Sequence, residues 1–178
     1  MAGGLGEEGW MAWSRADLHL HTTRSDGRHS PARLAAALKR STLAVAAVTD
    51  HNTVAGALEV EEALDGEGPE IVIGTEVSSD EGHVLALFVD GDIPAGLSAE
   101  DTIAAIHECG GLAIAAHPFS MSLGVGDLAA QLDFDGVEMV NGSPLMEVAN
   151  ARAARRLSGT AAAHTGGSDA HVVKAIGG

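Results

Sequence analysis

The chain contains very few residues of the kinds that would cross-link it or carry it across a membrane. Its single cysteine, Cys109, excludes an internal disulfide and favours a reducing compartment. No apolar run approaches the roughly 20 residues of a membrane span, and residues 1–9 lack the basic and apolar regions of a signal peptide. We therefore expect a cytoplasmic protein that has no membrane partner.

Basic residues are scarce, because 10 Lys and Arg stand against 25 Asp and Glu, which gives a formal net charge of −15. Such a charge repels nucleic-acid phosphates and anionic membranes unless bound cations offset it. Three divalent ions would bring the total to roughly −9 and leave a positive spot inside an acidic protein. A small anionic substrate could then bind the metals. A nucleic-acid end stays open as a substrate, although the charge does not indicate it.

Aromatic side chains make up only 3% of the chain, whereas hydrophobic residues reach 46%, many of them alanine or valine. Such a composition favours a core of small aliphatic side chains and suits α/β packing. We expect residues 1–14 to be a loose terminal segment and residues 15–178 to form a single domain. Since few residues follow His171, the helix over the last strand should be short or missing. The sequence leaves open whether this C-terminus is natural or clipped.

Apolar segments alternate with segments of helical spacing. The predicted strands are Ala16–Leu20, Leu43–Thr49, Glu70–Thr75, His83–Val89, Leu112–Ala116, Gly136–Val140 and Ala162–Ser168. The predicted helices are Pro31–Arg40, Val54–Leu64, Ala99–Cys109 and Pro144–Leu157, and Ser30 and Ser98 are candidate helix starts. This alternation predicts a largely parallel sheet, either open or closed into a barrel.

One connection breaks the alternation. Only Val77–Gly82 separates the third predicted strand from the fourth, and parallel strands cannot be joined by so short a segment. We therefore predict an antiparallel hairpin, which would set Glu76, at the end of one strand, beside His83, at the start of the next.

Histidines and carboxylates cluster in short motifs at the ends of these strands. In Asp17-Leu18-His19-Leu20-His21 the two histidines have i, i+2 spacing, which on an extended strand places both side chains on one face. Taken singly, the other candidates have simpler explanations: His51 and His117 as turn residues, Glu76 as a solvated charge and Asp169 as a helix cap. Their joint occurrence at one predicted rim favours a metal site.

The motifs, taken in chain order, resemble those of the PHP (polymerase and histidinol phosphatase) domain family over residues 17–171. They are DLHLHT (17–22), SDG (25–27), TDHN (49–52), GTE (74–76), GHVLALF (82–88), AHP (116–118), EMVN (138–141) and GSDAH (167–171). The resemblance implies a distorted seven-stranded (β/α)7 barrel with a trinuclear divalent-metal site at the rim. Residues 90–112 hold one loop and one helix, so the cap insertion of some relatives is absent.

The resemblance also implies a set of metal ligands. His19, His21, Glu76 and Asp169 would hold the first ion, Glu76 would bridge to a second held by His83 and His117, and Asp26, His51 and His171 would hold the third. Whether Asp26 or His29 completes the third site stays open. Asp17 and Asp50 are expected to orient ligand histidines.

The implied activity is that of a metal-dependent phosphoesterase. It would hydrolyse a phosphomonoester or a nucleotide or polynucleotide phosphate through attack by a metal-bound hydroxide. Imidazole and carboxylate ligands without cysteine favour two to three Mn²⁺, Fe²⁺ or Zn²⁺ ions. Arg24, Arg28 and Asn141 are candidate substrate contacts, with surface or turn roles as equal alternatives. A catalytically silent, metal-stabilised scaffold and an amide hydrolase are the competing interpretations. Substrate identity, the metal and the oligomeric state stay open.

Overall fold

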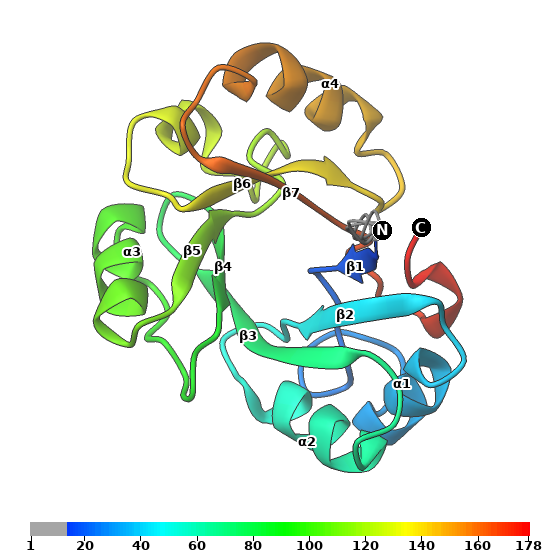
Figure 1. The fold of residues 1–178 in the computed structure, drawn as a ribbon. Helices are drawn as coiled ribbons and strands as arrows, with labels where there is room; N and C mark the ends of the chain where they lie inside the picture. The colour runs from blue at the N-terminus through cyan, green and yellow to red at the C-terminus, as the bar shows by residue number, and fades with distance from the viewer. Residues whose placement is uncertain (1–13) are drawn as a thin grey trace, which may run out of the picture.

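The structure, a computed structural model, describes residues 14–178 (Figure 1). Apart from Ser14, the expectation of a loose segment over residues 1–14 lies outside the described residues. The elements in chain order are β1 (Arg15–Asp17), α1 (Pro31–Leu38), β2 (Leu43–Val48), α2 (Ala55–Leu64), β3 (Glu70–Ser78), β4 (His83–Leu87), α3 (Ala99–Glu108), β5 (Leu112–Ala115), the 3-10 helix η1 (Gly126–Ala130), β6 (Gly136–Asn141), α4 (Glu147–Leu157), β7 (Ala163–Gly167) and the 3-10 turn η2 (Val173–Ala175).

The seven strands form one sheet in the order β1 to β7, which curls into a nearly closed barrel with helices around its outside (Figure 1). The segments that follow the first and last strands meet at a parallel bridge between Leu20 and Ala170. This arrangement confirms the predicted α/β class and the distorted seven-stranded barrel. Only the short turn η2 follows β7 in the described chain.

The predicted hairpin is confirmed. β3 pairs with β4 in antiparallel register, with Ser78 opposite His83, and β4 pairs with β5 in the same sense. The remaining neighbours, β1–β2, β2–β3, β5–β6 and β6–β7, are parallel. Because β4 alone runs against the others, its first residue lies at the rim where they end. His83 therefore reaches the same rim as the strand-end motifs.

Both candidate helix starts are confirmed. Ser30 accepts a hydrogen bond from the Arg33 N–H, and Ser98 accepts one from the Asp101 N–H, so both cap helices as predicted. The last predicted helix begins at Glu147 rather than Pro144. A turn precedes it, in which Leu145 has a left-handed φ of 75° that a helix cannot contain.

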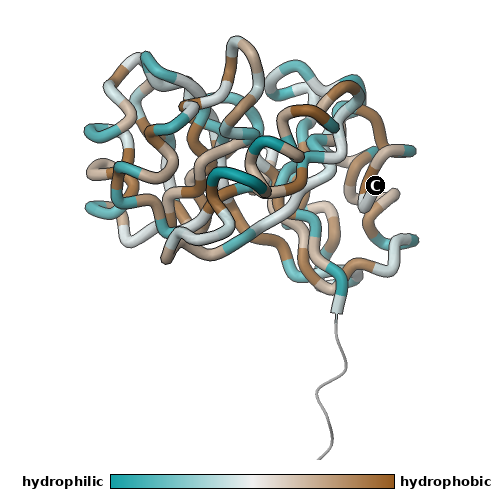
Figure 2. Tube along the Cα trace, turned by 90° about the horizontal axis from the view of Figure 1, so that it is seen from above, coloured by the Kyte–Doolittle hydropathy of each residue, from teal (hydrophilic) through white to brown (hydrophobic). Residues whose placement is uncertain are grey.

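Small aliphatic side chains fill the core. One cluster, with Ala47, Val72, Leu85 and Ile114 among its members, draws on strands and the residues next to them, so it packs strand against strand. Two further clusters join strand residues to helix residues, as between Val48 and Leu34. Hydrophilic residues gather in the outer loops (Figure 2). Among residues 14–178 no helix is long and apolar enough to span a membrane.

Candidate metal centre

The centre is built around Glu76, which lies on β3 and is 1% exposed. Its two carboxylate oxygens face five imidazole rings. The distances from Oε2 are 3.1 Å to His19 Nε2, 3.3 Å to His21 Nε2 and 3.4 Å to His51 Nδ1, and those from Oε1 are 2.7 Å to His83 Nδ1 and 3.0 Å to His117 Nε2. One carboxylate therefore lies between two groups of nitrogen donors, as a bridging ligand would.

Two aspartates complete the donor set. Asp169, directly after β7, has Oδ1 3.3 Å from His21 Nε2 and 3.5 Å from His171 Nδ1. Asp26 has Oδ2 3.0 Å from His171 Nε2 and 3.7 Å from His51 Nε2. The structure thus places Asp26, rather than His29, against the two histidines of the implied third site.

The donors fit a metal centre on three counts. Five groups of three potential ligands lie with their donor atoms within 4.8 Å of one another, and in the described chain these groups contain the nine predicted ligands and no other residue. The groups share members, so neighbouring ions would share ligands. His21 Nε2, which lies 3.3 Å from both Glu76 Oε2 and Asp169 Oδ1, is buried without a well-formed hydrogen bond, as expected of an atom that coordinates an ion. All the donors are imidazole or carboxylate, since Cys109 is exposed and outside the groups.

Mutual charge shifts the pKa values of these groups in the metal-free protein. Burial opposes the charged form of His19, yet the carboxylates of Glu138 and Glu76 outweigh it and raise the His19 pKa well above its ordinary value. Burial likewise opposes charge on His21, but contacts with Asp169 and Glu76 raise its pKa to about 9. Conversely, burial favours neutral Glu76, while the surrounding histidines hold its pKa well below the usual range. Metal binding must therefore displace protons.

Two of the predicted ligands have uncommon backbone conformations. His117 has a φ of 25° and Asp169 a φ of 51°, both in the left-handed region that side chains other than glycine rarely adopt. Such strain, on the order of 1–3 kcal/mol each, persists only where surrounding contacts hold it, and it concentrates at functional sites.

A further buried carboxylate, Glu138 on β6, was assigned no role from the sequence and lies next to two predicted ligands. Its Oε1 lies 3.0 Å from His19 Nδ1, and its Oε2 accepts hydrogen bonds from the His117 N–H at 2.8 Å and from Asn141 Nδ2 at 3.0 Å. The sequence signals were its place on a predicted strand and at the start of the EMVN motif (138–141).

The prediction that Asn141 contacts substrate needs correction. The residue is 2% exposed, and its Nδ2 donates to Glu138 and, at 3.2 Å, to Asp169 Oδ2. Its Oδ1 accepts from the Ser143 N–H at 2.9 Å. The amide group of Asn141 is thus hydrogen-bonded to protein groups through all the contacts given above, and two of these contacts hold carboxylates next to the metal centre.

Asp17 and Asp50 contact no histidine ring, although Asp17 Oδ1 accepts a long hydrogen bond of 3.4 Å from the His19 N–H. Asp50 accepts hydrogen bonds from the Thr22 N–H, from Thr22 Oγ1 and from Ser25 Oγ, at 2.6 to 2.8 Å. It therefore holds the loop that carries Asp26. Asp17 accepts hydrogen bonds of 2.8 Å from the Ser168 N–H and from the Gly177 N–H. These two bonds join β1 to residues near the end of the chain.

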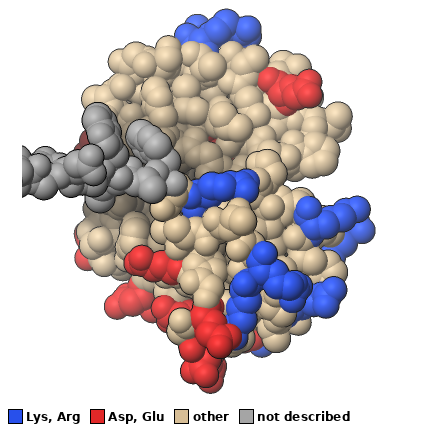
Figure 3. All heavy atoms as spheres, turned by 45° about the vertical axis from the view of Figure 1, so that its right-hand side comes forward, with Lys and Arg blue, Asp and Glu red and all other residues tan. Residues whose placement is uncertain are grey.

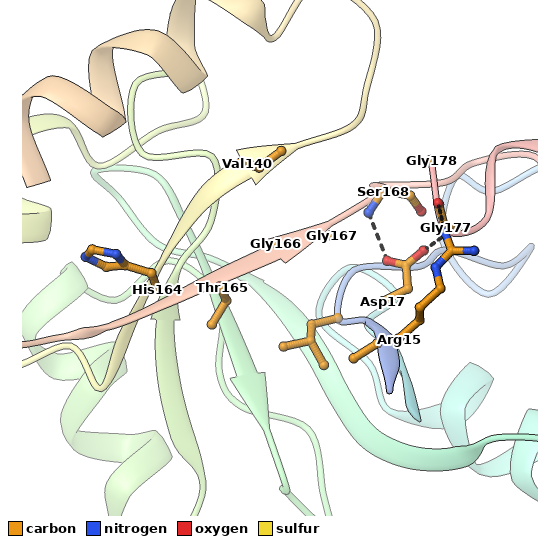
Figure 4. Close-up of a pocket in the computed structure, with 12 residues that line it drawn as sticks. Arg15, Asp17, Val140, His164, Thr165, Gly166, Gly167, Ser168, Gly177 and Gly178 are labelled. Atoms are coloured by element: carbon orange, nitrogen blue, oxygen red, sulfur yellow. Dashed lines mark hydrogen bonds between the residues drawn. The ribbon is translucent and has the colours of Figure 1, made fainter. Parts of the chain in front are cut away.

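The Asp17 contacts lie in a cleft of about 450 Å³ along the seam between β1 and β7 (Figure 4). Arg15, His164 and Gly178 also line it. None of the nine predicted ligands is among its lining residues. The cleft is therefore separate from the metal centre, even though Asp17 lies two residues from His19 and Ser168 lies one residue from Asp169 in sequence.

The two predicted substrate arginines are both exposed. Arg24 forms an ion pair of 2.6 Å with Glu59, and the Arg28 N–H donates to the His171 carbonyl at 2.8 Å. On the face shown in Figure 3, Lys and Arg side chains lie at the top, at the centre and over the lower right, and acidic side chains lie at the upper right and along the lower edge.

The fold and the donors together define an α/β-barrel protein with a candidate histidine–carboxylate metal centre at its rim. The PHP domain matches residues 17–135, and the chain belongs to the PHP domain family. An uncharacterized protein from Methanocaldococcus jannaschii is 42% identical over 139 residues, which cover 71% of this chain and 81% of that protein.

Two solved structures share the fold. One is an amidohydrolase from Chromobacterium violaceum, with bound sulfate and no metal, at 19% identity and a TM-score of 0.75; the match covers 92% of this chain and 90% of that one. The other is a two-domain protein from Bacteroides vulgatus containing a "predicted PHP-like metal-dependent phosphoesterase". It has 19% identity and a TM-score of 0.70, over 90% of this chain and 53% of that one.

Proposed function

We propose that this protein is a hydrolase that uses divalent metal ions to cleave phosphate esters. The observation that carries the proposal is the buried Glu76 carboxylate, whose two oxygens each face a separate group of imidazoles. A carboxylate placed in this way can hold two cations close together, which is the arrangement that phosphoryl hydrolysis uses.

The chain supplies ligands for two to three ions. His19, His21, Glu76 and Asp169 would hold the first, Glu76, His83 and His117 the second, and Asp26, His51 and His171 the third. Mn²⁺, Fe²⁺ and Zn²⁺ suit these donors. Bound there, such ions would activate a water molecule as nucleophile and neutralise the phosphate oxygens.

The substrate would approach from the side of the Asp26 loop. The side chains of His19 and Glu76 are 0% and 2% exposed, whereas those of Asp26 and His171 are 55% and 36% exposed. The third group contains the most exposed of the predicted ligands, since His83 and His117 of the second group are 13% and 3% exposed, so the phosphate would meet the third group first. Arg24 and Arg28 flank that loop, and Arg24 would have to leave Glu59 to contact a phosphate.

The substrate class is a phosphomonoester or a nucleotide or polynucleotide phosphate. Two findings support this substrate class: the chain belongs to the PHP domain family, and the Bacteroides vulgatus relative is described as containing a phosphoesterase. A small anionic ester agrees best with the net charge of −15.

Amide hydrolysis by the same ions is the second candidate, because the Chromobacterium violaceum relative of the same fold is described as an amidohydrolase. A silent, metal-stabilised scaffold is the third interpretation. The complete donor set, with no gap among the nine ligands, favours an enzyme over the scaffold.

The experiment begins with elemental analysis of the purified protein, before and after reloading with Mn²⁺. The Mn²⁺-loaded protein is then assayed on p-nitrophenyl phosphate, a 5′-phosphorylated RNA oligonucleotide and a p-nitroanilide panel. We expect two to three ions per chain and phosphate release that is abolished in His19→Ala. His164→Ala, at an exposed histidine outside the donor groups, is the matched control.

Each alternative has its own result. Release from anilides alone would favour amide hydrolysis. A metal-loaded protein that is inactive on every phosphoester and every amide would leave the scaffold, and a protein that retains no metal would remove the basis of all three interpretations.

A further inference from the structure

Glu138 lies behind the metal centre and faces no solvent, since it is 1% exposed. Its two oxygens contact two different ligands: Oε1 the ring of His19 and Oε2 the backbone N–H of His117. Asn141 extends the unit by donating to both Glu138 and Asp169. Three ligands carried by three different strand ends are thus joined through two side chains that bind no ion themselves.

We propose that Glu138 is the positioning residue for the two ions nearest Glu76, and that it aligns His19 and His117 together with the help of Asn141. This inference rests on the proposed function, because it concerns how the chain prepares its own side chains for metal.

The contact with His19 selects which ring nitrogen faces the ion. An imidazole whose Nδ1–H donates to a carboxylate presents the other nitrogen, Nε2, as the free donor. In this structure His19 Nε2 is the atom that lies 3.1 Å from Glu76. With an ion at Nε2, Glu138 would therefore hold the Nδ1–H tautomer, and with or without the ion it restrains the rotation of the ring.

The contact with His117 acts on the backbone. His117 has the uncommon φ of 25°, and its N–H has Glu138 Oε2 as acceptor at 2.8 Å. A charged acceptor forms a stronger hydrogen bond than a neutral one, so it can hold a strained residue in place. Without it, the turn after β5 could relax and move the ring from Glu76.

Gly167 on β7 leaves the space that the His19–Glu138 pair occupies. A Cβ at this position would lie 2.4 Å from the His19 Cβ and 2.9 Å from Glu138 Oε1. Both distances are far inside van der Waals contact. The strand next to β6 is therefore shaped around this pair.

The support is specific to one half of the centre. Glu138 makes no hydrogen bond to Asp26, His51 or His171, the ligands of the third position. That position depends on a separate carboxylate, Asp50, which holds the Asp26 loop through Thr22 and Ser25. The two supports can therefore be removed one at a time.

The test compares Glu138→Ala, Glu138→Gln and Asp50→Asn with the wild-type chain. Zn²⁺ affinities are measured by competition with a chromophoric chelator. For Glu138→Ala we expect the two ions nearest Glu76 to bind 10- to 100-fold more weakly, as is typical when a group that orients a ligand is lost. Asp50→Asn should weaken one ion only, and Glu108→Gln, at an exposed glutamate, should weaken none.

A spectroscopic readout separates positioning from general stability. In protein labelled with ¹⁵N-histidine, the Nδ1–H proton of His19 should be protected from exchange, both metal-free and Zn²⁺-loaded. Glu138→Ala should lose this signal. Glu138→Gln nearly preserves the volume and keeps one acceptor oxygen, so it should restore the signal while remaining weaker than wild type at the second ion.

Unchanged affinities and an unchanged His19 signal in folded Glu138→Ala would overturn the inference and leave the proposed function intact. Equal weakening of all three ions would also overturn it, since Glu138 would then act on the whole fold. A wild-type chain that binds no Zn²⁺ or Mn²⁺ would overturn the proposed function, and the inference with it.

Discussion

Replacing Glu76 by glutamine tests the electrostatic balance of the centre in the absence of metal. Glu76 is ionised at neutral pH and faces His19, which carries a proton there because its pKa is raised, and His21, whose pKa is about 9. Glutamine keeps the shape and removes the charge. Removing one partner of a buried ion pair costs on the order of 3–5 kcal/mol, because the other charge stays uncompensated.

The sign of the pH dependence follows from the histidines. A group whose folded pKa lies above its unfolded value of about 6.5 contributes stability that is complete below that value. For His21 this contribution is lost as the pH rises through about 9. The variant should therefore be destabilised most at pH 6, and the part of the difference that comes from His21 should fade as the pH rises through about 9.

Urea denaturation in EDTA at pH 6 and pH 9.5 measures both differences, and Glu108→Gln serves as the control. Equal destabilisation at the two pH values would show that Glu76 acts through shape rather than charge. No destabilisation at pH 6 would refute the reasoning altogether. With metal added, Glu76→Gln should also lose most of the stabilisation that ligand binding provides, about 2.7 kcal/mol at 100 times the dissociation constant.

Three further changes address other parts of the structure. Although burial favours its neutral form, contacts with His21 and His19 lower the pKa of Asp169 to about 2. Asp169 should therefore contribute about 2 kcal/mol to the free energy of unfolding above pH 4, and this contribution is lost as the pH falls through about 2. Acid denaturation of Asp169→Asn in EDTA should lack this loss. Gly167→Ala should cost about 1–3 kcal/mol through overpacking, measured by thermal unfolding, whereas Gly159→Ala, with open space around it, should be near neutral. Asp17→Ala should cost about 1–3 kcal/mol in urea because it leaves the buried Ser168 N–H unpaired; a smaller effect would mean that water replaces the carboxylate.

Much of the fold could be predicted because its determinants are local. The alternation of apolar and helical segments set the element order, and the shortness of Val77–Gly82 required antiparallel strands. That single inference placed His83 at the rim with Glu76, although it opens a strand instead of ending one. The prediction was least accurate for the first strand. The predicted range was Ala16–Leu20, whereas β1 is only Arg15–Asp17, since the residues after it leave the regular strand pairing to carry His19 and His21.

The sequence by itself determined which side chains would gather at one rim, because strand order and direction bring residues together whatever their rotamers. Only the tertiary structure decided which carboxylates support the centre. Asp17 and Asp50 adjoin ligand histidines in sequence yet bind backbone and loop groups, whereas Glu138 lies 119 residues from His19 and contacts its ring. A hydrogen bond depends on the direction and distance of two atoms to within a fraction of an ångström. Such geometry arises from the packing of neighbouring strands, which no spacing along the chain records.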